Sequence, residues 1–232
     1  MDDGKPLARV YCSGPLFCPE EIAGMTAIAE TLEAAGYETF LPHRDGLERF
    51  VTKALKDPRF MSRSPRRLNL FASKAVFALD LYQIVECCDS LVMNLNGRVP
   101  DEGAVVETAV AFAAGKPLVL YKNDSRAPFH GNDNSMVAGL SYTFTTVNRI
   151  DEIPGELRRV ARKLERMGGS PYRSGNLPPA MRQVTDFGRL IWGLMRRLRF
   201  FQAGSDDEAL DRLKRIVKLC ETHPAMKGPG WV

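Results

Sequence analysis

The sequence has few of the residues and motifs on which metal sites, disulfides and phosphate loops depend. Its 232 residues include three His and five Cys, and no two Cys form a CxxC pair. Zinc sites and disulfide frameworks use paired ligands or an even number of Cys, so we expect neither. The spacing GxGxxG and the strings GKS and GKT are also absent, which removes the usual phosphate-binding signatures.

Long apolar runs and a strong excess of one charge are missing as well. No uninterrupted apolar run approaches the roughly 18 residues of a membrane span, and the start "MDDGKPLARV" is acidic and polar, unlike a signal peptide. The formal charge of +4 arises from 32 basic and 28 acidic residues, a balance that does not indicate nucleic acid. With 44% hydrophobic and 26% charged residues, we expect a soluble cytoplasmic globular protein with no membrane or nucleic-acid partner.

Strand-like and helix-like segments alternate along the first 150 residues. Short apolar runs predict strands, and segments with helical spacing of apolar residues separate them. Residues 43–68 are charged and contain two prolines, which predicts a loop with a short helix. The predicted strands are residues 8–14, 37–42, 90–97, 117–123 and 142–147, and the predicted helices include 19–35, 69–88 and the segment around Glu107. This order predicts a doubly wound, mainly parallel five-stranded sheet with helices on both faces.

A binding site in such a sheet lies beyond the carboxyl ends of its strands. The turn of Ser13, Gly14 and Pro15 follows the first strand, and Asn96 follows the third. Glu107 lies about one turn into the next helix, in an otherwise apolar sequence. We expect its carboxylate to point into the same crevice, although a polar stripe on a surface helix would produce the same pattern.

The turn after the first strand suits a neutral ligand better than a phosphate. In "SGPLFCPEE" both prolines lack N–H donors, and Glu20 and Glu21 would repel an anion. Leu16 and Phe17 instead offer apolar surface to a base or a sugar.

Two further carboxylates are candidates to act beside Glu107. A carboxylate such as Glu107 can trap an oxocarbenium-like state as a covalent glycosyl ester, while a protonated carboxyl group protonates the leaving base. Asp101 and Asp80 are candidates for that second carboxyl. Asp101 is equally suited to cap its helix. The alternative for Asp80 is a solvated helix face. The alternative for Tyr11 is a place in the core with its hydroxyl at the sheet end. No metal or organic cofactor is needed.

Several strings occur in an order and spacing typical of one family. They are "YCSGPLF" from Tyr11, "FLPHRDG" from Phe40, "DLYQIVECCDSLVMNLNGRVPDEGAVVE" from Asp80, "AAGKPLVLYKND" from Ala113 and, more weakly, "NDNSMVAGL" from Asn132. Over about residues 9–142 the chain resembles the nucleoside 2-deoxyribosyltransferase family.

The resemblance implies a flavodoxin-like or Rossmann-like fold and transfer of a deoxyribosyl group from a 2′-deoxynucleoside to another nucleobase. It implies that Glu107 is the nucleophile, that Asp80 and Asp101 orient or protonate the base, and that Tyr11 positions the nucleophile. It also implies a homo-oligomer, a dimer or higher, in which a neighbouring subunit completes the site.

Other residues are expected to bind substrate. The "HRDG" piece is either a turn or a substrate contact, and Asn134 and Met136 lie in the segment that could reach across to a neighbour. The candidate binding residues are Ser13, Gly14, Pro15, Phe17, His43, Arg44, Asp45, Asn96, Gly103, Asn134 and Met136. Thr108-Ala109 stands where the family usually has Leu-Gly or Ala-Gly, and Ser135 stands where it usually has Pro. Because of these differences, the resemblance does not define the shape of the pocket.

The C-terminal third forms a basic helical extension. We expect residues 1–150 to form the α/β domain and residues 151–232 the extension. Residues 156–200 carry eleven Arg or Lys against three Asp or Glu, and apolar residues recur at helical spacing around residues 184–201 and 210–220. We expect two amphipathic helices that pack on the main domain or on a neighbouring subunit. A basic surface for nucleic acid or an anionic membrane is the alternative.

The sequence is therefore compatible with three functions: deoxyribosyl transfer through Glu107, hydrolysis of nucleosides or their 5′-monophosphates, and sensing through binding of a nucleoside or nucleotide. The sequence does not decide between purine and pyrimidine or between ribose and deoxyribose.

Overall fold

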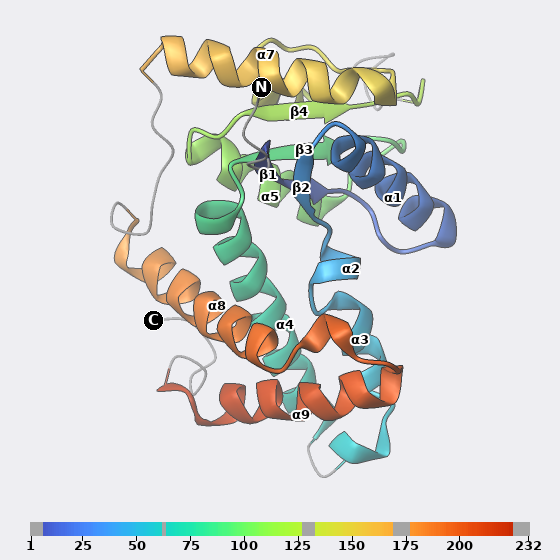
Figure 1. Ribbon diagram of the computed structural model, residues 1–232, viewed down its shortest axis with the longest axis vertical. Coiled ribbons are helices and arrows are strands. Elements are labelled where there is room, and N and C mark those ends of the chain that lie inside the picture. Colours follow the sequence, from blue (N-terminus) through green and yellow to red (C-terminus); the bar gives the residue numbers. More distant parts are fainter. Residues whose placement is uncertain (1–6, 62–63, 127–132, 169–176, 225–232) are drawn as a thin grey trace. The chain divides into compact units, whose positions relative to one another are not determined.

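The computed structural model describes residues 7–61, 64–126, 133–168 and 177–224, which form two compact units (Figure 1). The first unit comprises Met1–Leu41 and Ile84–Arg173, and the second comprises Pro42–Gln83 and Ser174–Val232. The positions of the units relative to one another are not determined.

The first unit is built on a parallel sheet with helices on both faces. Its strands are β1 (Leu7–Ser13), β2 (Tyr37–Phe40), β3 (Ser90–Asn94) and β4 (Leu118–Tyr121), paired in the order β2-β1-β3-β4. Its helices are α1 (Pro19–Ala34), α5 (Glu102–Ala113), α6 (Ser135–Ala138) and α7 (Ile153–Arg166), with 3-10 turns η3 (Gly139–Ser141) and η4 (Ile150–Glu152). This arrangement is a Rossmann-like or flavodoxin-like fold, as predicted.

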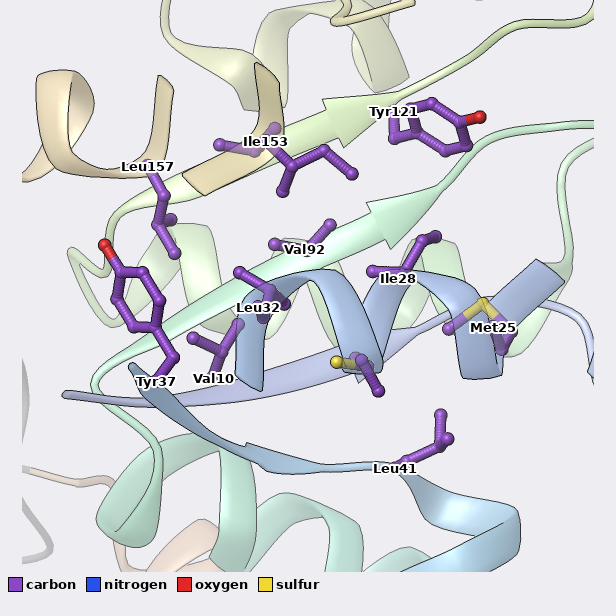
Figure 2. Close-up of a cluster of buried hydrophobic side chains, with 13 residues drawn as sticks. Val10, Met25, Ile28, Leu32, Tyr37, Leu41, Val92, Tyr121, Ile153 and Leu157 are labelled. Atoms are coloured by element: carbon purple, nitrogen blue, oxygen red, sulfur yellow. The ribbon is translucent and has the colours of Figure 1, made fainter. Parts of the chain in front are cut away.

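Alternation along β1 assigns its side chains to opposite faces. Val10 and Cys12 belong to the buried cluster that the sheet forms with α1 and α7 (Figure 2), whereas Tyr11 and Ser13 bond to residues of α5. Because successive side chains of a strand point to opposite faces, one strand supplies both the core and polar groups of the α5 face.

The connections match the predicted turn chemistry. Pro19 opens α1, and Gly36 follows the helix with φ of +90°, a conformation that glycine adopts without steric cost. The chain then enters β2 directly.

The predicted fifth strand is wrong. Within residues 142–147, only Val147 makes an isolated bridge, to Tyr121 of β4. Tyr142 and Phe144 adopt left-handed backbone conformations, with φ of 61° and 57°. Extended pairing requires negative φ, so this segment turns instead of adding a strand.

The second unit is helical. Residues 43–68 are more helical than predicted. The elements of this unit are α2 (Pro42–Asp45), α3 (Glu48–Ala54), η1 (Pro58–Phe60), α4 (Pro65–Tyr82), α8 (Pro179–Arg197), η6 (Phe200–Gln202) and α9 (Asp206–Thr222). The two amphipathic C-terminal helices that the periodicity predicts are α8 and α9.

Close contacts and ion pairs hold this unit together. A Cβ added at Gly188 of α8 would lie 2.0 Å from the carbonyl oxygen of Ala78 in α4, so the two helix backbones approach closely. Arg59 binds Asp57, Asp207 and Asp211 at 2.6, 2.8 and 3.3 Å, which ties η1 to α9.

By length and composition alone, the helical segment Pro65–Cys87 could cross a membrane, because an 18-residue window within it has a mean hydropathy of 1.3. In the protein, 61% of that window is buried, as in the central helix of a bundle. Lys74 and Asp80 interrupt its apolar sequence.

The boundaries of the two units differ from the predicted single boundary at residue 150. Ile153 and Leu157 of α7 lie in the core of the sheet (Figure 2), so α7 belongs with the α/β unit. Residues 42–83, between β2 and β3, group instead with α8 and α9, because α4 packs against both helices.

Candidate active site

The strand order defines a switch point between β1 and β3, where a ligand crevice is expected. From β1 the chain moves to β2 on one side, and from β3 to β4 on the other, so the order reverses between these central strands. Ligands of open α/β sheets bind beyond the carboxyl ends of the strands at such a point. Ser13 and Asn94 are the last residues of the two strands.

The turn after β1 needs glycine at position 14. A Cβ added at Gly14 would lie 2.5 Å from Sδ of Met25 and 2.9 Å from Cβ of Asn94. Both distances are shorter than real Cβ contacts, so only glycine lets the turn pass this close to β3. Asn94 is itself buried at the end of an apolar strand, a position the sequence analysis did not single out although the signal, one Asn after "LVM", was present.

Glu107 points from α5 to the carboxyl end of β1. The Tyr11 hydroxyl donates to its Oε1 at 2.8 Å, and the Ser13 hydroxyl donates to its Oε2 at 2.5 Å. Tyr11 and Ser13 are fully buried, and Tyr11 stacks on Phe40 with ring centroids 5.4 Å apart. Two donors from a rigid central strand therefore fix both carboxylate oxygens. Ser13 was predicted to bind substrate, and this bond to Glu107 was not foreseen.

The environment raises the pKa of Glu107 to about 7. Burial is the largest cause, because it disfavours the charged form, and the negative charge of Asp101 adds to it. The hydrogen bonds from Ser13 and Tyr11 act in the opposite direction, since they stabilise the carboxylate. Near neutral pH the group is therefore divided between its protonated and its ionised form.

Asp101 caps α5, as predicted. Its Oδ1 accepts a hydrogen bond from the backbone N–H of Ala104 at 2.7 Å. The side chain thus satisfies a free donor at the helix start. Gly103 lies against the same carboxylate, since a Cβ there would be 3.2 Å from Oδ1. A role for Asp101 in protonating the base stays a prediction.

Thr108, which stands where Leu or Ala was expected, adds no polar group to the site. Thr108 is fully buried, and its hydroxyl donates to the carbonyl of Ala104 one turn earlier at 2.7 Å. Its hydrogen bond is satisfied within α5.

The N-terminus of α1 is already occupied by a carboxylate. Oε2 of Glu21 accepts from the backbone N–H groups of Phe17 and Cys18 at 2.8 and 3.2 Å. These donors are the ones that a phosphate would use at a helix start. The aromatic ring of Phe17 is 84% exposed beside this turn, which also contains Pro15.

Asn96 joins the loops that follow β3 and β4. Its Oδ1 accepts from the N–H of Asn123 at 2.9 Å, and its own N–H donates to Asn94. Gly97 donates to Asp124 at 3.0 Å. These bonds connect the two loops at the carboxyl edge of the sheet, and Asn123 and Asp124 were not anticipated from the sequence.

The segment with Asn134 and Met136 starts α6. Asn134 caps this short helix, accepting from the N–H of Met136 at 2.9 Å, while the Met136 side chain is 82% exposed. An ion pair between Asp133 and Lys122 links the segment to the end of β4.

The remaining predicted residues lie in the second unit, so the structure does not place them against Glu107. Asp80 is on α4, and His43, Arg44 and Asp45 are on α2. Arg44 pairs with Asp45 at 3.0 Å, and burial lowers the pKa of His43. Their catalytic or binding roles stay predictions.

In the described ranges, no three His, Cys, Asp or Glu side chains gather as metal ligands would. The site instead presents a carboxylate held by two hydroxyl donors at the switch point of a parallel α/β sheet. These features define a class: doubly wound proteins with a buried, hydrogen-bonded carboxylate at the carboxyl edge of the sheet.

Comparison with known proteins supplies the family. The family model described as "Nucleoside 2-deoxyribosyltransferase" matches residues 10–142, more than half of the chain. The chain belongs to this family, which suggests a deoxyribosyltransferase-type enzyme acting on nucleosides and nucleobases.

Other comparisons add less. No protein of curated function matches the chain. A conserved protein from Enterococcus faecalis V583, known from its crystal structure, is 20% identical with a TM-score of 0.47, over 66% of this chain and 98% of that one.

Proposed function

We propose that the protein cleaves the N-glycosidic bond of a 2′-deoxynucleoside and transfers the deoxyribosyl group to a second nucleobase. One Glu107 oxygen forms a bond to C1′ as the bond from C1′ to the base nitrogen breaks and the base takes up a proton. A nitrogen of the second base then attacks C1′, loses its proton, and releases the Glu107 carboxylate. Each base nitrogen gains or loses one proton, so the exchange balances without a cofactor.

The observation that carries this proposal is the fixation of Glu107 by Tyr11 and Ser13 at the crevice between β1 and β3. A nucleophile must be held in line with the carbon it attacks. With both oxygens bonded to a buried central strand, the carboxylate has little freedom to rotate away. We assign the proton transfer to the base to Asp101 or Asp80, whose roles the experiments below separate.

The α1 terminus favours a free nucleoside over a 5′-monophosphate. Glu21 occupies the N–H donors of Phe17 and Cys18, and its charge repels a second anion. The exposed Phe17 ring offers a stacking surface for a base.

We further propose that the protein acts as a homo-oligomer. α5, α6 and the segment after α6 expose large apolar side chains, namely Val106, Phe112, Met136 and Phe144. Phe112 stacks on Tyr142 with centroids 4.9 Å apart, so these elements share one surface. A second copy of this chain would cover it. Light scattering behind size-exclusion chromatography tests this, and Val106→Asp is expected to shift the mass toward the monomer.

The decisive experiment is base exchange followed by chromatography. The protein is incubated with each 2′-deoxynucleoside, with and without a second free base, beside Glu107→Ala and Glu107→Gln. Glu102→Gln is the matched control, because Glu102 is an exposed residue of the same helix. A new nucleoside is expected only with the acceptor base, and both Glu107 variants should lose at least about 10³-fold in rate.

Other outcomes would redirect the proposal. Free base without exchange would indicate a hydrolase, to be repeated with 5′-monophosphates. Binding without turnover of any substrate would favour the sensor. Full activity in Glu107→Gln would contradict the covalent mechanism.

A further inference from the structure

The first unit has a pocket at the amino edge of its sheet, at the opposite ends of the strands from Glu107. It has a volume of about 420 Å³, within the range of small-molecule sites. Its floor contains residues at the start of three strands, Ala8, Tyr37 and Ser90, together with Pro117 before β4. Residues 157–165 of α7 form its wall.

Most of the pocket surface is apolar. Leu157, Ala161 and Leu164 of α7 face Ala8 and Pro117 across it. Figure 2 shows the ring of Tyr37 directed toward Leu157, with its hydroxyl oxygen at the end nearest that side chain. This lining suits a compact aromatic or aliphatic group.

One polar group inside the pocket lacks a partner. Ser90 is only 4% exposed, and its hydroxyl has no hydrogen-bond partner in the part of the chain that the structure describes. Buried hydroxyls are normally bonded, and leaving one unbonded is costly. A ligand oxygen in the pocket would satisfy it.

The charges around the pocket favour an anion. Arg158 and Arg162 lie one turn apart on α7 and line the pocket, and no ion pair involves either one among the described residues. Of the two acidic groups in the lining, Asp89 already accepts from the backbone N–H of Arg9 at 2.9 Å. Glu165 lies one turn beyond Arg162, toward the end of the helix.

We propose that this pocket binds a small molecule with an apolar body and one anionic group, such as a carboxylate, sulfonate or phosphate. The apolar body contacts Leu157 and Ala161, the anion pairs with Arg158 and Arg162, and Ser90 donates to a ligand oxygen. This site is independent of the proposed transferase reaction, because it uses the opposite ends of β1 and β3.

The fluorescent probe anilinonaphthalene sulfonate tests the site, since it combines an aromatic body with a sulfonate. Its titration into the full-length protein is expected to give saturable, one-to-one binding. Ala161→Trp, which fills the pocket, should weaken binding at least about 20-fold. Arg158→Gln and Arg162→Gln should each weaken it about 2- to 5-fold, and Glu165→Gln should strengthen it by a similar factor.

The control is Arg159→Gln, which removes a neighbouring charge that pairs with Glu156 and is not part of the pocket lining. Its affinity should equal that of the natural chain. Circular dichroism verifies the fold of each variant, and the exposed arginine substitutions test the site even if Ala161→Trp fails to fold. Equal affinity in Ala161→Trp and in the arginine variants would overturn the proposal. Loss of binding in Val106→Ser would place the probe on α5 and would also overturn it.

Discussion

Glu107 is subject to opposing influences on its pKa. Burial and the charge of Asp101 raise it to about 7, while the donors Tyr11 and Ser13 limit the rise. A nucleophile that is partly desolvated yet held by hydrogen bonds is more reactive than one in water but still ionises near neutral pH. This balance leads to two predictions.

The first prediction concerns the pH dependence of activity. In the proposed reaction only the ionised carboxylate attacks, so kcat/KM should rise about tenfold per pH unit below about 7 and level off above it. Tyr11→Phe removes a bond that favours the carboxylate, so the midpoint should move to higher pH. A pH series of initial rates measures both midpoints; a lower midpoint in Tyr11→Phe would refute the assigned role of the hydroxyl.

The second prediction concerns stability. The folded state holds the Glu107 proton more tightly than the unfolded chain, whose pKa is near 4.5. Stability therefore falls as pH rises from about 4.5 to about 7. Glu107→Gln removes this loss, and it should raise the free energy of unfolding by at most about 3 kcal/mol at pH 8 and by almost nothing at pH 4. Urea unfolding at the two pH values measures the difference, with Glu102→Gln as the reference; an equal gain at both would contradict the linkage.

At the scale of the element, Asp101 caps helix α5 and is also a candidate to protonate the base, and these two roles can be separated. Asp101→Ala should cost about 1 kcal/mol of stability because the cap on the Ala104 N–H is lost, whereas Asp101→Asn keeps the cap and should cost little. If the carboxyl protonates the base, both variants should lose activity alike. Thermal unfolding and base-exchange rates distinguish the roles, and an active Asp101→Asn would assign protonation elsewhere, with Asp80→Asn as the next variant.

Helix α8 offers a matched pair of glycines. Gly188→Ala drives a Cβ into the backbone of α4 at Ala78, and it should cost more than about 3 kcal/mol. Gly193→Ala in the same helix meets no atom within 4 Å and should stabilise by up to about 1 kcal/mol. Denaturant midpoints of the two variants test this packing, and similar effects at both positions would argue against it.

At the scale of the whole molecule, the second unit depends on segments far apart in the sequence. Leu68, Phe71 and Ala75 of α4 line the same small apolar space as Leu213 and Ile216 of α9. The arginine excess of α8 lies on a helix whose other face is buried, which agrees with packing as the role of the apolar stripe.

Truncation tests this arrangement. A chain ending at Gly169 lacks α8 and α9, so the apolar face of α4 becomes exposed. We expect a lower soluble fraction or a change in assembly state, measured by sedimentation velocity. Unchanged solubility and mass would show that the C-terminal helices do not cover α4.

Local patterns in the sequence predicted most of the elements and part of the site. Strand β1, helix α1 with its closing Gly36, the cap at Asp101 and the two C-terminal helices follow from periodicity and turn chemistry, which act between neighbours in the chain. The position of Glu107 in an apolar helix after the third strand made it a candidate, and the family resemblance, which the family match over residues 10–142 confirms, implies its role as the nucleophile.

Only the tertiary structure decided the contacts between distant residues. The bonds of Tyr11 and Ser13 to Glu107 span more than 90 residues, and the pKa of Glu107 depends on burial that no local pattern encodes. The left-handed conformations of Tyr142 and Phe144 prevented a fifth strand, and the grouping of residues 42–83 with α8 and α9 replaced a simple boundary at residue 150. Periodicity determines which face of an element is apolar, whereas the partner that buries that face is chosen by packing across the whole chain.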